Sequence, residues 1–248
     1  MGLGSDPNFQ YIHLKCTLLA LFGSIVYFSF VQTLTKIILE HGLGDRFISS
    51  SQLERLIEGS DKRRFGLVNR AIKSGELIRV KRGLYMLARR HRKHPVHPFA
   101  LAQALVPGSY ISFETALSQH GWLPEKVVTT ASVAPGRRSS RYESSDLGVF
   151  SFQPLSINRG YHLTLVKRIQ IDAQTMLLAE PIRALLDLIC LRKTEWQSAS
   201  WLVEGLRIDL GVLAEQSRSN ELETMQGVYK NRRMQRFISA LRQELNCD

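Results

Sequence analysis

Basic side chains gather in one short segment of this chain. The 248 residues carry a formal net charge of +11, and residues 62–94 hold twelve Lys or Arg against a single acid, Glu76, so the remaining residues balance. Clustered Lys and Arg displace the counterions condensed on phosphate, which is the chemistry of binding a polyanion. Solvated surface is the plainer interpretation of a charge run. The elements inside the segment decide between the two.

Three short helices are expected in and just before the basic segment. The first spans roughly residues 34–41, where apolar side chains have helical spacing. Ser51 and Glu54 fit a capping box at the start of the second helix. The third helix runs from about Lys62 to Ser74 and is stopped by Gly75, which tolerates a left-handed backbone.

The third helix is expected to have two different faces. An apolar arc for the core would hold Phe65, Leu67, Val68, Ala71 and Ile72. The other arc offers charge for phosphates and an amide suited to base edges, and its glycine has a bare backbone that permits close approach of a partner. The residues of this second arc are Lys62, Arg63, Gly66, Asn69, Arg70 and Lys73.

After the third helix the period changes from helical to alternating. Residues 77–86 predict two short strands around a turn at Arg82 and Gly83. Helices followed directly by a basic hairpin indicate a winged helix-turn-helix, whose last helix enters the major groove while the wing touches the DNA backbone. We therefore predict that double-stranded DNA binds to Lys62, Arg63, Asn69, Arg70 and Lys73 on the helix and to Arg79, Lys81 and Arg82 on the wing.

The sequence predicts an α+β protein in which the winged helix-turn-helix is followed by a second domain. Residues 31–88 would form the DNA-binding domain, 89–97 a basic linker, and 98–248 a domain of helices around a small, mainly antiparallel sheet. Helices are expected over residues 177–191, 196–213 and 222–245, and a loop over 135–141. Possible secondary contacts to the DNA backbone are Arg89, Arg90, Arg137, Arg138 and Arg141.

Residues 1–30 form an apolar extension of uncertain role. The stretch 16–35 contains no charged residue and nearly has the length of a membrane span. Three interpretations stay open: a membrane anchor, a helix packed on the DNA-binding domain, or a segment translated from upstream of the true start. The three cysteines are far apart and form no metal-binding pair, which is typical of a protein in the reducing cytoplasm.

No set of residues predicts catalysis, a metal site or a cofactor. His91, His94 and His97 stand three residues apart, but Pro95 interrupts the helix that would align them. His120 could serve acid–base chemistry, yet a histidine at a helix end more often bonds the last carbonyls of that helix. Paired acids beside a lysine and glycine-rich phosphate loops are both missing. We therefore do not expect an enzyme.

Residues 71–85 resemble the wing signature of the AbiEi-type antitoxins of bacterial abortive-infection (type IV toxin–antitoxin) systems. Residues 97–102, 110–112, 115–121 and 179–187 also resemble that family, so the likeness extends over about residues 34–191. It implies a phage-defence protein that represses its own toxin operon at inverted repeats, with dimerisation on DNA. It also implies an antitoxin role for the second domain, against a nucleotidyltransferase-like toxin that need not be contacted directly.

Two alternatives of other classes remain. One is a nucleic-acid-processing enzyme with its active site in the second domain, which metal-dependent cleavage of DNA or RNA would support. The other is a protein–protein module whose C-terminal helices bind the toxin directly.

Overall fold

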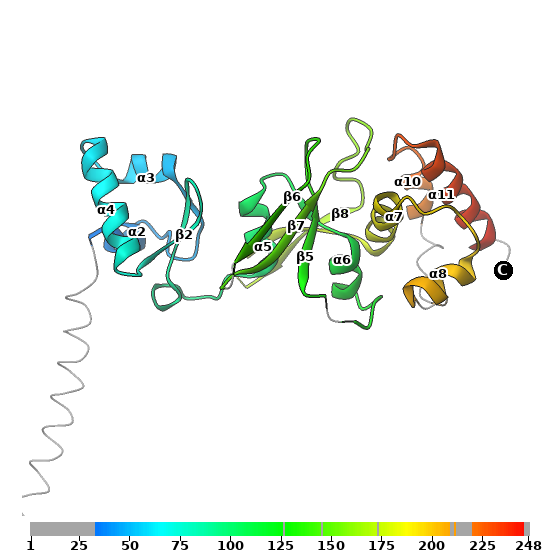
Figure 1. Ribbon diagram of the computed structural model, residues 1–248, viewed down its shortest axis with the longest axis horizontal. Helices are drawn as coiled ribbons and strands as arrows, with labels where there is room; N and C mark the ends of the chain where they lie inside the picture. Colours follow the sequence, from blue (N-terminus) through cyan, green and yellow to red (C-terminus); the bar gives the residue numbers. More distant parts are fainter. Residues whose placement is uncertain are drawn as a thin grey trace, which may run out of the picture. The chain divides into compact units, whose positions relative to one another are not determined.

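The computed structural model describes residues 33–125, 127–144, 146–172, 174–208, 211 and 220–245, which divide into two compact units between Pro95 and Val96 (Figure 1). We call them the N-unit and the C-unit. The apolar extension 1–30 lies outside the described residues, and what was expected of it stays a prediction. Among the described residues, none of the helices has the length and apolar character needed to span a membrane.

The N-unit is a winged helix-turn-helix, as the sequence predicted. Its elements in order are α2 (Thr33–Glu40), β1 (Ile48–Ser49), α3 (Ser50–Leu56), α4 (Asp61–Lys73), β2 (Leu77–Lys81) and β3 (Leu84–Leu87). The strands pair antiparallel in the order β1-β3-β2. The β2–β3 hairpin is the wing, and Gly83 in its turn has a φ of +77° that a side chain would strain.

The start of α3 differs from the sequence prediction. Its capping box is made by Ser49 and Gln52, not by Ser51 and Glu54. The Ser49 hydroxyl accepts a hydrogen bond from the Gln52 amide at 3.2 Å, and the Gln52 side chain accepts one from the Ser49 amide at 2.8 Å. The short strand β1, which was not expected, ends at Ser49 in an extended conformation and so moves the cap two residues upstream.

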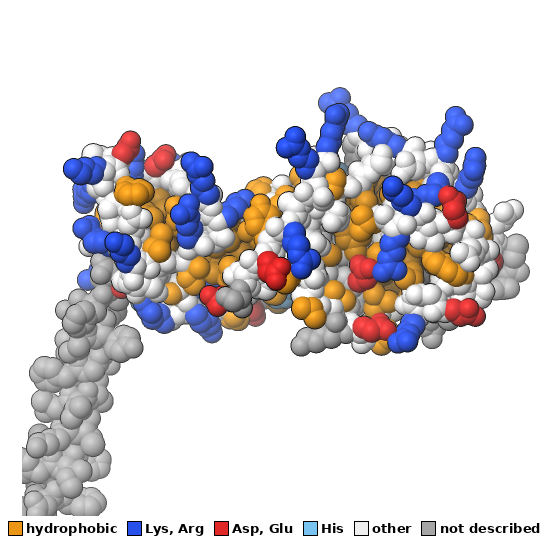
Figure 2. Space-filling view, in the orientation of Figure 1, with side chains coloured by type: hydrophobic (Ala, Val, Ile, Leu, Met, Phe, Trp, Pro, Cys, Tyr) orange, Lys and Arg blue, Asp and Glu red, His pale blue; other side chains and the backbone are white. Residues whose placement is uncertain are grey.

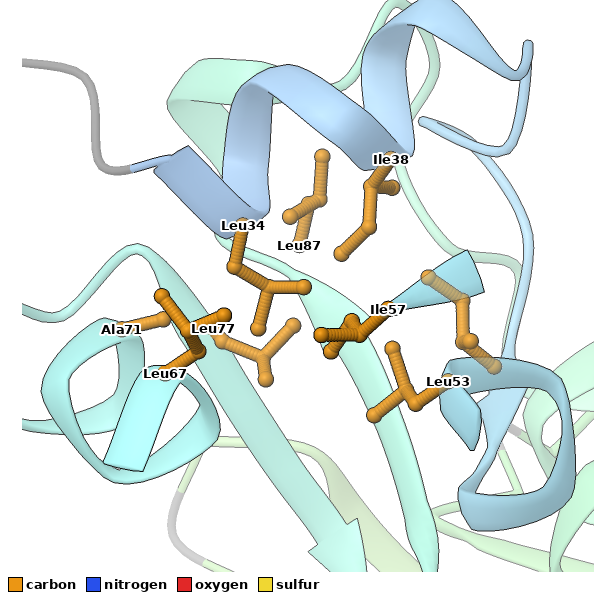
Figure 3. Packing of buried hydrophobic residues seen from close by; sticks show 9 residues of the cluster. Leu34, Ile38, Leu53, Ile57, Leu67, Ala71, Leu77 and Leu87 are labelled. Atoms are coloured by element: carbon orange, nitrogen blue, oxygen red, sulfur yellow. The ribbon is translucent and has the colours of Figure 1, made fainter. Parts of the chain in front are cut away.

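The core of the N-unit joins α2, α3, α4 and the wing. Figure 3 shows its apolar side chains pointing toward one another, with Leu34 and Ile38 from α2, Leu67 and Ala71 from α4, and strand residues such as Leu77 between them. Full burial of one leucine or isoleucine contributes about 1.5–3 kcal/mol. This cluster therefore fixes which face of α4 is buried and which face is exposed to solvent.

Phe65 is not part of that core, which contradicts the predicted apolar arc of α4. Its side chain is 70% exposed, whereas Leu67 and Ala71 are buried. Phe65 lies two residues before Leu67, a spacing that places the two side chains nearly opposite each other around a helix. The buried stripe of α4 is thus narrower than its apolar sequence pattern.

The C-unit is built on a six-stranded mixed sheet of order β6-β7-β5-β4-β9-β8. The pairs β4–β9 and β5–β7 are parallel and the other pairs antiparallel, so the sheet is larger and more mixed than expected. The strands are β4 (Tyr110–Ile111), β5 (Thr129–Val133), β6 (Ser140–Ser144), β7 (Gly148–Gln153), β8 (Val166–Ile171) and β9 (Gln174–Ala179).

Helices cover this sheet and follow it in the chain. Helix α5 packs against β4, β5 and β9, while α6 packs against β5 and α7. Helices α10 and α11 come after them, and α11 contacts α8. The helices are α5 (Pro98–Leu105), α6 (Phe113–Gln119), α7 (Pro181–Arg192), α8 (Ala199–Leu206), α10 (Glu221–Met225) and α11 (Arg232–Leu245).

Three predicted elements of the C-unit have different bounds in the structure. Residues 177–179 belong to strand β9, because Pro181 is suited to the first turn of α7 and starts the helix there. The expected helix over 222–245 is broken into α10 and α11, with the buried Tyr229 between them. The expected loop at 135–141 already contains the beginning of β6. Most of the end of the helix expected at 196–213 lies outside the described residues.

Candidate nucleic-acid interface

The outer face of α4 carries the basic residues that the sequence singled out. Lys62, Arg63, Arg70 and Lys73 are exposed, and Asn69 is half-buried beside them. Because Leu67 and Ala71 anchor the opposite side of the helix in the core, this face is held toward solvent. Figure 2 shows blue Lys and Arg side chains on both sides of a small hydrophobic area in the region of α3 and α4.

Most of these cations have no partner within the part of the chain that the structure describes. Side-chain hydrogen bonds and ion pairs are absent there for Lys62, Arg70, Lys73, Arg79 and Arg82. A cation without an internal carboxylate keeps its full interaction energy for an external anion. This set of five residues extends from α4 to the wing. Two arginines of α4 do have partners: Arg63 donates from Nη1 to the Glu58 carbonyl at 3.1 Å, and Arg64 pairs with Asp61.

The single acid of the basic segment faces away from this surface. Glu76 is only 5% exposed, and its Oε2 accepts a hydrogen bond of 2.6 Å from the Thr35 hydroxyl on α2. Asp61, at the start of α4, forms an ion pair with Arg64 at the edge of the helix. The exposed surface of the basic segment is therefore more purely cationic than its sequence, because the carboxylate within it is buried.

The wing is held close to the start of α3. The Ser50 amide donates to the Gly83 carbonyl at 2.9 Å, which ties the turn of the hairpin to the first residue of that helix. Arg79 and Arg82 are exposed and Lys81 is half-buried. A register shift between Arg79 and Lys81 bends β2 where these basic side chains lie.

Residues 89–94 are attached to the N-unit. Arg90 donates from Nη2 to the Ser74 carbonyl at 3.2 Å, and Arg89 from Nη1 to the Arg92 carbonyl at 3.1 Å. The Asp45 carboxylate accepts hydrogen bonds from the amides of Lys93 and His94 at 2.8 and 3.1 Å. Arg89 and Arg90 are nevertheless exposed, so their positions are compatible with secondary backbone contacts.

A second basic surface lies on the C-unit. Arg137 lines a cleft of about 720 Å³ together with Arg159 and Lys230, which come from loops distant in the sequence. These three cations have no side-chain partner among the described residues. Arg138 is exposed nearby in the sequence, while Arg141 forms an ion pair of 3.5 Å with Glu143 on β6. Sequence patterns missed this surface because Arg137, Arg159 and Lys230 are far apart in the sequence and only the fold brings them together.

A buried polar network is the most distinctive feature of the C-unit. The carboxylate of Asp187 on α7 accepts from the hydroxyls of Ser112, Tyr110 and Tyr229, at 2.8, 2.9 and 2.7 Å. Arg183, one turn earlier on α7, donates from Nε to Asp187 at 3.0 Å and from Nη2 to the Tyr110 hydroxyl at 2.6 Å. None of these five side chains has more than a trace of exposure.

The network stabilises the fold and does not form a reactive site. Burial would lower the pKa of Arg183, but Asp187 and the two tyrosine oxygens raise it above its ordinary value. Burial, and then Asp187, raise the pKa of Tyr110 and Tyr229 well above theirs. The arginine thus stays charged and the phenols stay protonated. Because every member is bonded and buried, no side chain of the network is available to a substrate.

Neither histidine candidate forms a reactive site in the described residues. The ring of His120 donates from Nε2 to the Ala179 carbonyl at 2.9 Å, so it joins α6 to the end of β9 and not, as expected, to the last carbonyls of its own helix. His97 caps α5 by accepting from the Phe99 amide on Nδ1. No group of three metal-ligating side chains occurs in the described parts of the chain.

Comparison with known families gives a match within the N-unit. Residues 38–88 match the model of a family described as transcriptional regulator, AbiEi antitoxin. The matched range includes α3, α4 and the wing, and the four further segments in which a resemblance was expected lie beyond it. No curated protein matches the chain. Over residues 38–88 the chain is therefore similar to the AbiEi-type transcriptional regulators.

Proposed function

We propose that the N-unit binds duplex DNA, with α4 in the major groove and the β2–β3 wing on the phosphate backbone. The observation that carries the proposal is the set of exposed cations on α4 and the wing, where Glu76, the single acid of residues 62–94, is buried and Asp61 at the start of α4 is paired with Arg64. A winged helix-turn-helix uses these two elements for DNA. The contact residues would be Lys62, Arg63, Asn69, Arg70, Lys73, Arg79, Lys81 and Arg82.

The chain would act as a repressor of its own promoter and as the antitoxin of a type IV system. The family match to residues 38–88 supports a regulator of this kind. Repression by occupancy requires only that the protein compete with polymerase for the promoter. Binding as a dimer at inverted repeats follows from the symmetry of such operators. The toxin would be nucleotidyltransferase-like, and the protein would work in the bacterial cytoplasm.

The C-unit would carry the antitoxin role and strengthen DNA binding. Arg137 and Arg138, with Arg141 less favoured because of its Glu143 partner, would touch phosphates outside the groove. Arg89 and Arg90 would do the same from the segment 89–97, between a DNA-binding domain of residues 31–88 and an antitoxin domain of residues 98–248. Each phosphate contact adds to affinity and to its dependence on salt.

Footprinting of the full chain on the DNA upstream of its own reading frame tests this function. We expect protection of a site that contains inverted repeats, and loss of that protection in Arg70→Ala/Lys73→Ala. Lys36→Ala removes a cation from α2 instead and is expected to keep the footprint, since Lys36 lies outside the proposed surface. Protection that survives Arg70→Ala/Lys73→Ala unchanged would contradict the assigned surface. Metal-dependent cleavage of the DNA would favour an enzyme instead.

A further inference from the structure

An exposed aromatic ring lies within the proposed DNA-binding surface. Phe65 on α4 is 70% exposed, and the described N-unit has only one other exposed large hydrophobic residue, Leu39 at 43%. Phe65 lies three residues after Lys62 and four before Asn69, spacings that bring side chains together on one side of a helix. Leaving the ring in water gives up the stabilisation that buried phenylalanine normally provides.

The packing of the N-unit does not account for this position. Leu67 and Ala71 already anchor α4, and Phe65 is absent from the core cluster. At the next residue, Gly66, an added Cβ would meet no atom within 4 Å, so this side of the helix is open. Phe65 instead borders a groove of about 490 Å³. Its wall includes Val68 and Tyr85 and the charged residues Glu54, Asp61 and Arg64.

The charges around the ring indicate which partner would cover it. Lys62 and Lys73 are exposed on α4 without partners among the described residues, whereas Asp61, the one acid of this helix, is paired with Arg64. The unpaired charge of α4 is therefore positive, which favours a polyanion over an apolar protein surface. In the major groove of DNA the apolar group between the phosphates is the C5-methyl of thymine, and aromatic side chains pack against it. Duplex DNA fits this face of α4, because its phosphates are anionic and a thymine methyl group lies between them in the major groove.

We propose that Phe65 determines sequence specificity by packing on the C5-methyl group of a thymine in the bound duplex. This inference rests on the proposed DNA-binding function. Residues four apart on a helix are about 6 Å apart along its axis, and base pairs are about 3.4 Å apart. The thymine therefore lies one or two base pairs from the base that Asn69 contacts.

Deoxyuridine substitution isolates the methyl group. The full chain is used to select its preferred duplex from a random-sequence library, and each thymine of that duplex is then replaced singly by deoxyuridine. We expect about four-fold weaker binding at one or two positions, the effect of losing one buried methyl group. Phe65→Ala should bind the thymine duplex more weakly and show no further loss with deoxyuridine. Phe65→Leu should keep most of the sensitivity.

Lys62→Ala is the matched control on the same face, because a phosphate contact does not distinguish thymine from deoxyuridine. It should weaken both duplexes equally. Equal deoxyuridine losses in the wild type and Phe65→Ala would overturn the inference, as would a wild type that is insensitive at every position. An unfolded Phe65→Ala, seen by circular dichroism, would also overturn it, because the ring would then be a core residue.

Two further outcomes separate the inference from its alternatives. If Phe65→Ala abolishes self-association in sedimentation but leaves deoxyuridine sensitivity intact, the ring contacts a second copy of the chain and the inference is wrong. If selection yields no duplex at all, the proposed DNA-binding function itself fails. A selected duplex without methyl dependence refutes only the role of Phe65.

Discussion

Two regions of this protein use arginine in opposite ways. On α4 and the wing, Arg70, Arg79 and Arg82 are at the surface and have no partner in the described residues. In the C-unit, Arg183 is completely buried and makes hydrogen bonds to Asp187, Tyr110 and backbone carbonyls. Surroundings therefore decide the role of the same side chain: an unpaired exposed guanidinium is available to phosphate, and a buried paired one stabilises the fold.

The sequence itself gives little warning of this difference. Both regions contain arginines on amphipathic or apolar helices, and in both a carboxylate lies close in sequence. Asp187 forms an ion pair with Arg183, one helical turn away. Glu76 is instead buried, where it accepts a hydrogen bond from Thr35, so it is not part of the outer face of the N-unit. Where the nearby carboxylate lies thus decides whether the arginines stay unpaired at the surface or join a buried network.

The largest effect is expected from breaking the buried pair. Asp187→Ala should destabilise the C-unit by about 3–5 kcal/mol, because it leaves the Arg183 charge buried without its partner. All three tryptophans of the chain lie in the C-unit, so urea unfolding followed by tryptophan fluorescence reports on that unit.

Glu114→Ala is the control for this variant. Glu114 pairs with Arg192, which is also on α7, but both side chains are substantially exposed. Such a pair contributes only about 0–1 kcal/mol. Equal destabilisation by the two substitutions would contradict the contrast between buried and exposed pairs. Salt-sensitive DNA binding should survive in Asp187→Ala as long as the N-unit stays folded.

A medium effect separates base contacts from backbone contacts within the DNA surface. Asn69→Ala should cost about 1–3 kcal/mol on the preferred duplex and little on scrambled DNA, because the contact proposed for its amide is with a base edge. Arg82→Ala should weaken both duplexes to a similar degree, since a phosphate contact is independent of sequence. Fluorescence anisotropy on the two duplexes makes the comparison. Equal losses of affinity on both duplexes for Asn69→Ala would contradict a contact between Asn69 and a base in the groove.

A smaller effect concerns the helix that supports the wing. Ser49→Ala removes the hydroxyl that caps α3 and should cost about 1 kcal/mol of stability in the N-unit. Hydrogen exchange at the Gln52 amide is the measurement, because that amide loses its partner. Ser51→Ala is the control at the position that the sequence had favoured, and it should leave the Gln52 amide protected. Faster exchange of the Gln52 amide in Ser51→Ala but not in Ser49→Ala would show that Ser51, and not Ser49, caps α3.

The smallest effect has opposite signs for stability and binding. Gly66→Ala should stabilise α4 by about 0.5–1 kcal/mol, because alanine favours helix and nothing lies within 4 Å of the new Cβ. If DNA approaches the bare backbone there, the same variant should bind it more weakly. Thermal unfolding and anisotropy of one preparation test both. Stabilisation with unchanged affinity would place Gly66 outside the contact.

Local patterns were sufficient to predict the winged helix-turn-helix. The apolar spacing of α4, the glycine of the wing turn and the cations all lie within about fifty residues. The exposure of Phe65 could not be predicted, because an apolar residue at the edge of a helical arc fits the core pattern equally well. The groove beside Phe65 is lined by residues of α3 and β3, which are not its neighbours in the sequence.

The buried network of the C-unit was beyond sequence reasoning for another reason. Tyr110 is 77 residues from Asp187, and Tyr229 is 42 residues from it. Tyr110 and Ser112 lie in one segment and Arg183 and Asp187 in another, and no local period indicates that the two segments meet. Residues 177–179, the last three of β9, were predicted as helix because a short apolar run fits a buried strand as well as a helix.

The salt dependence of DNA binding tests the central claim most directly. If the α4 and wing cations neutralise about five phosphates, log affinity should fall against log salt with a slope of roughly −4 to −5. Arg70→Ala/Lys73→Ala should bring the slope closer to zero by about 2, while Lys36→Ala should leave it unchanged. Anisotropy with the full chain and a labelled duplex gives the slope. A wild-type slope near zero would contradict the account, because the exposed cations would then make no contact with the phosphate backbone.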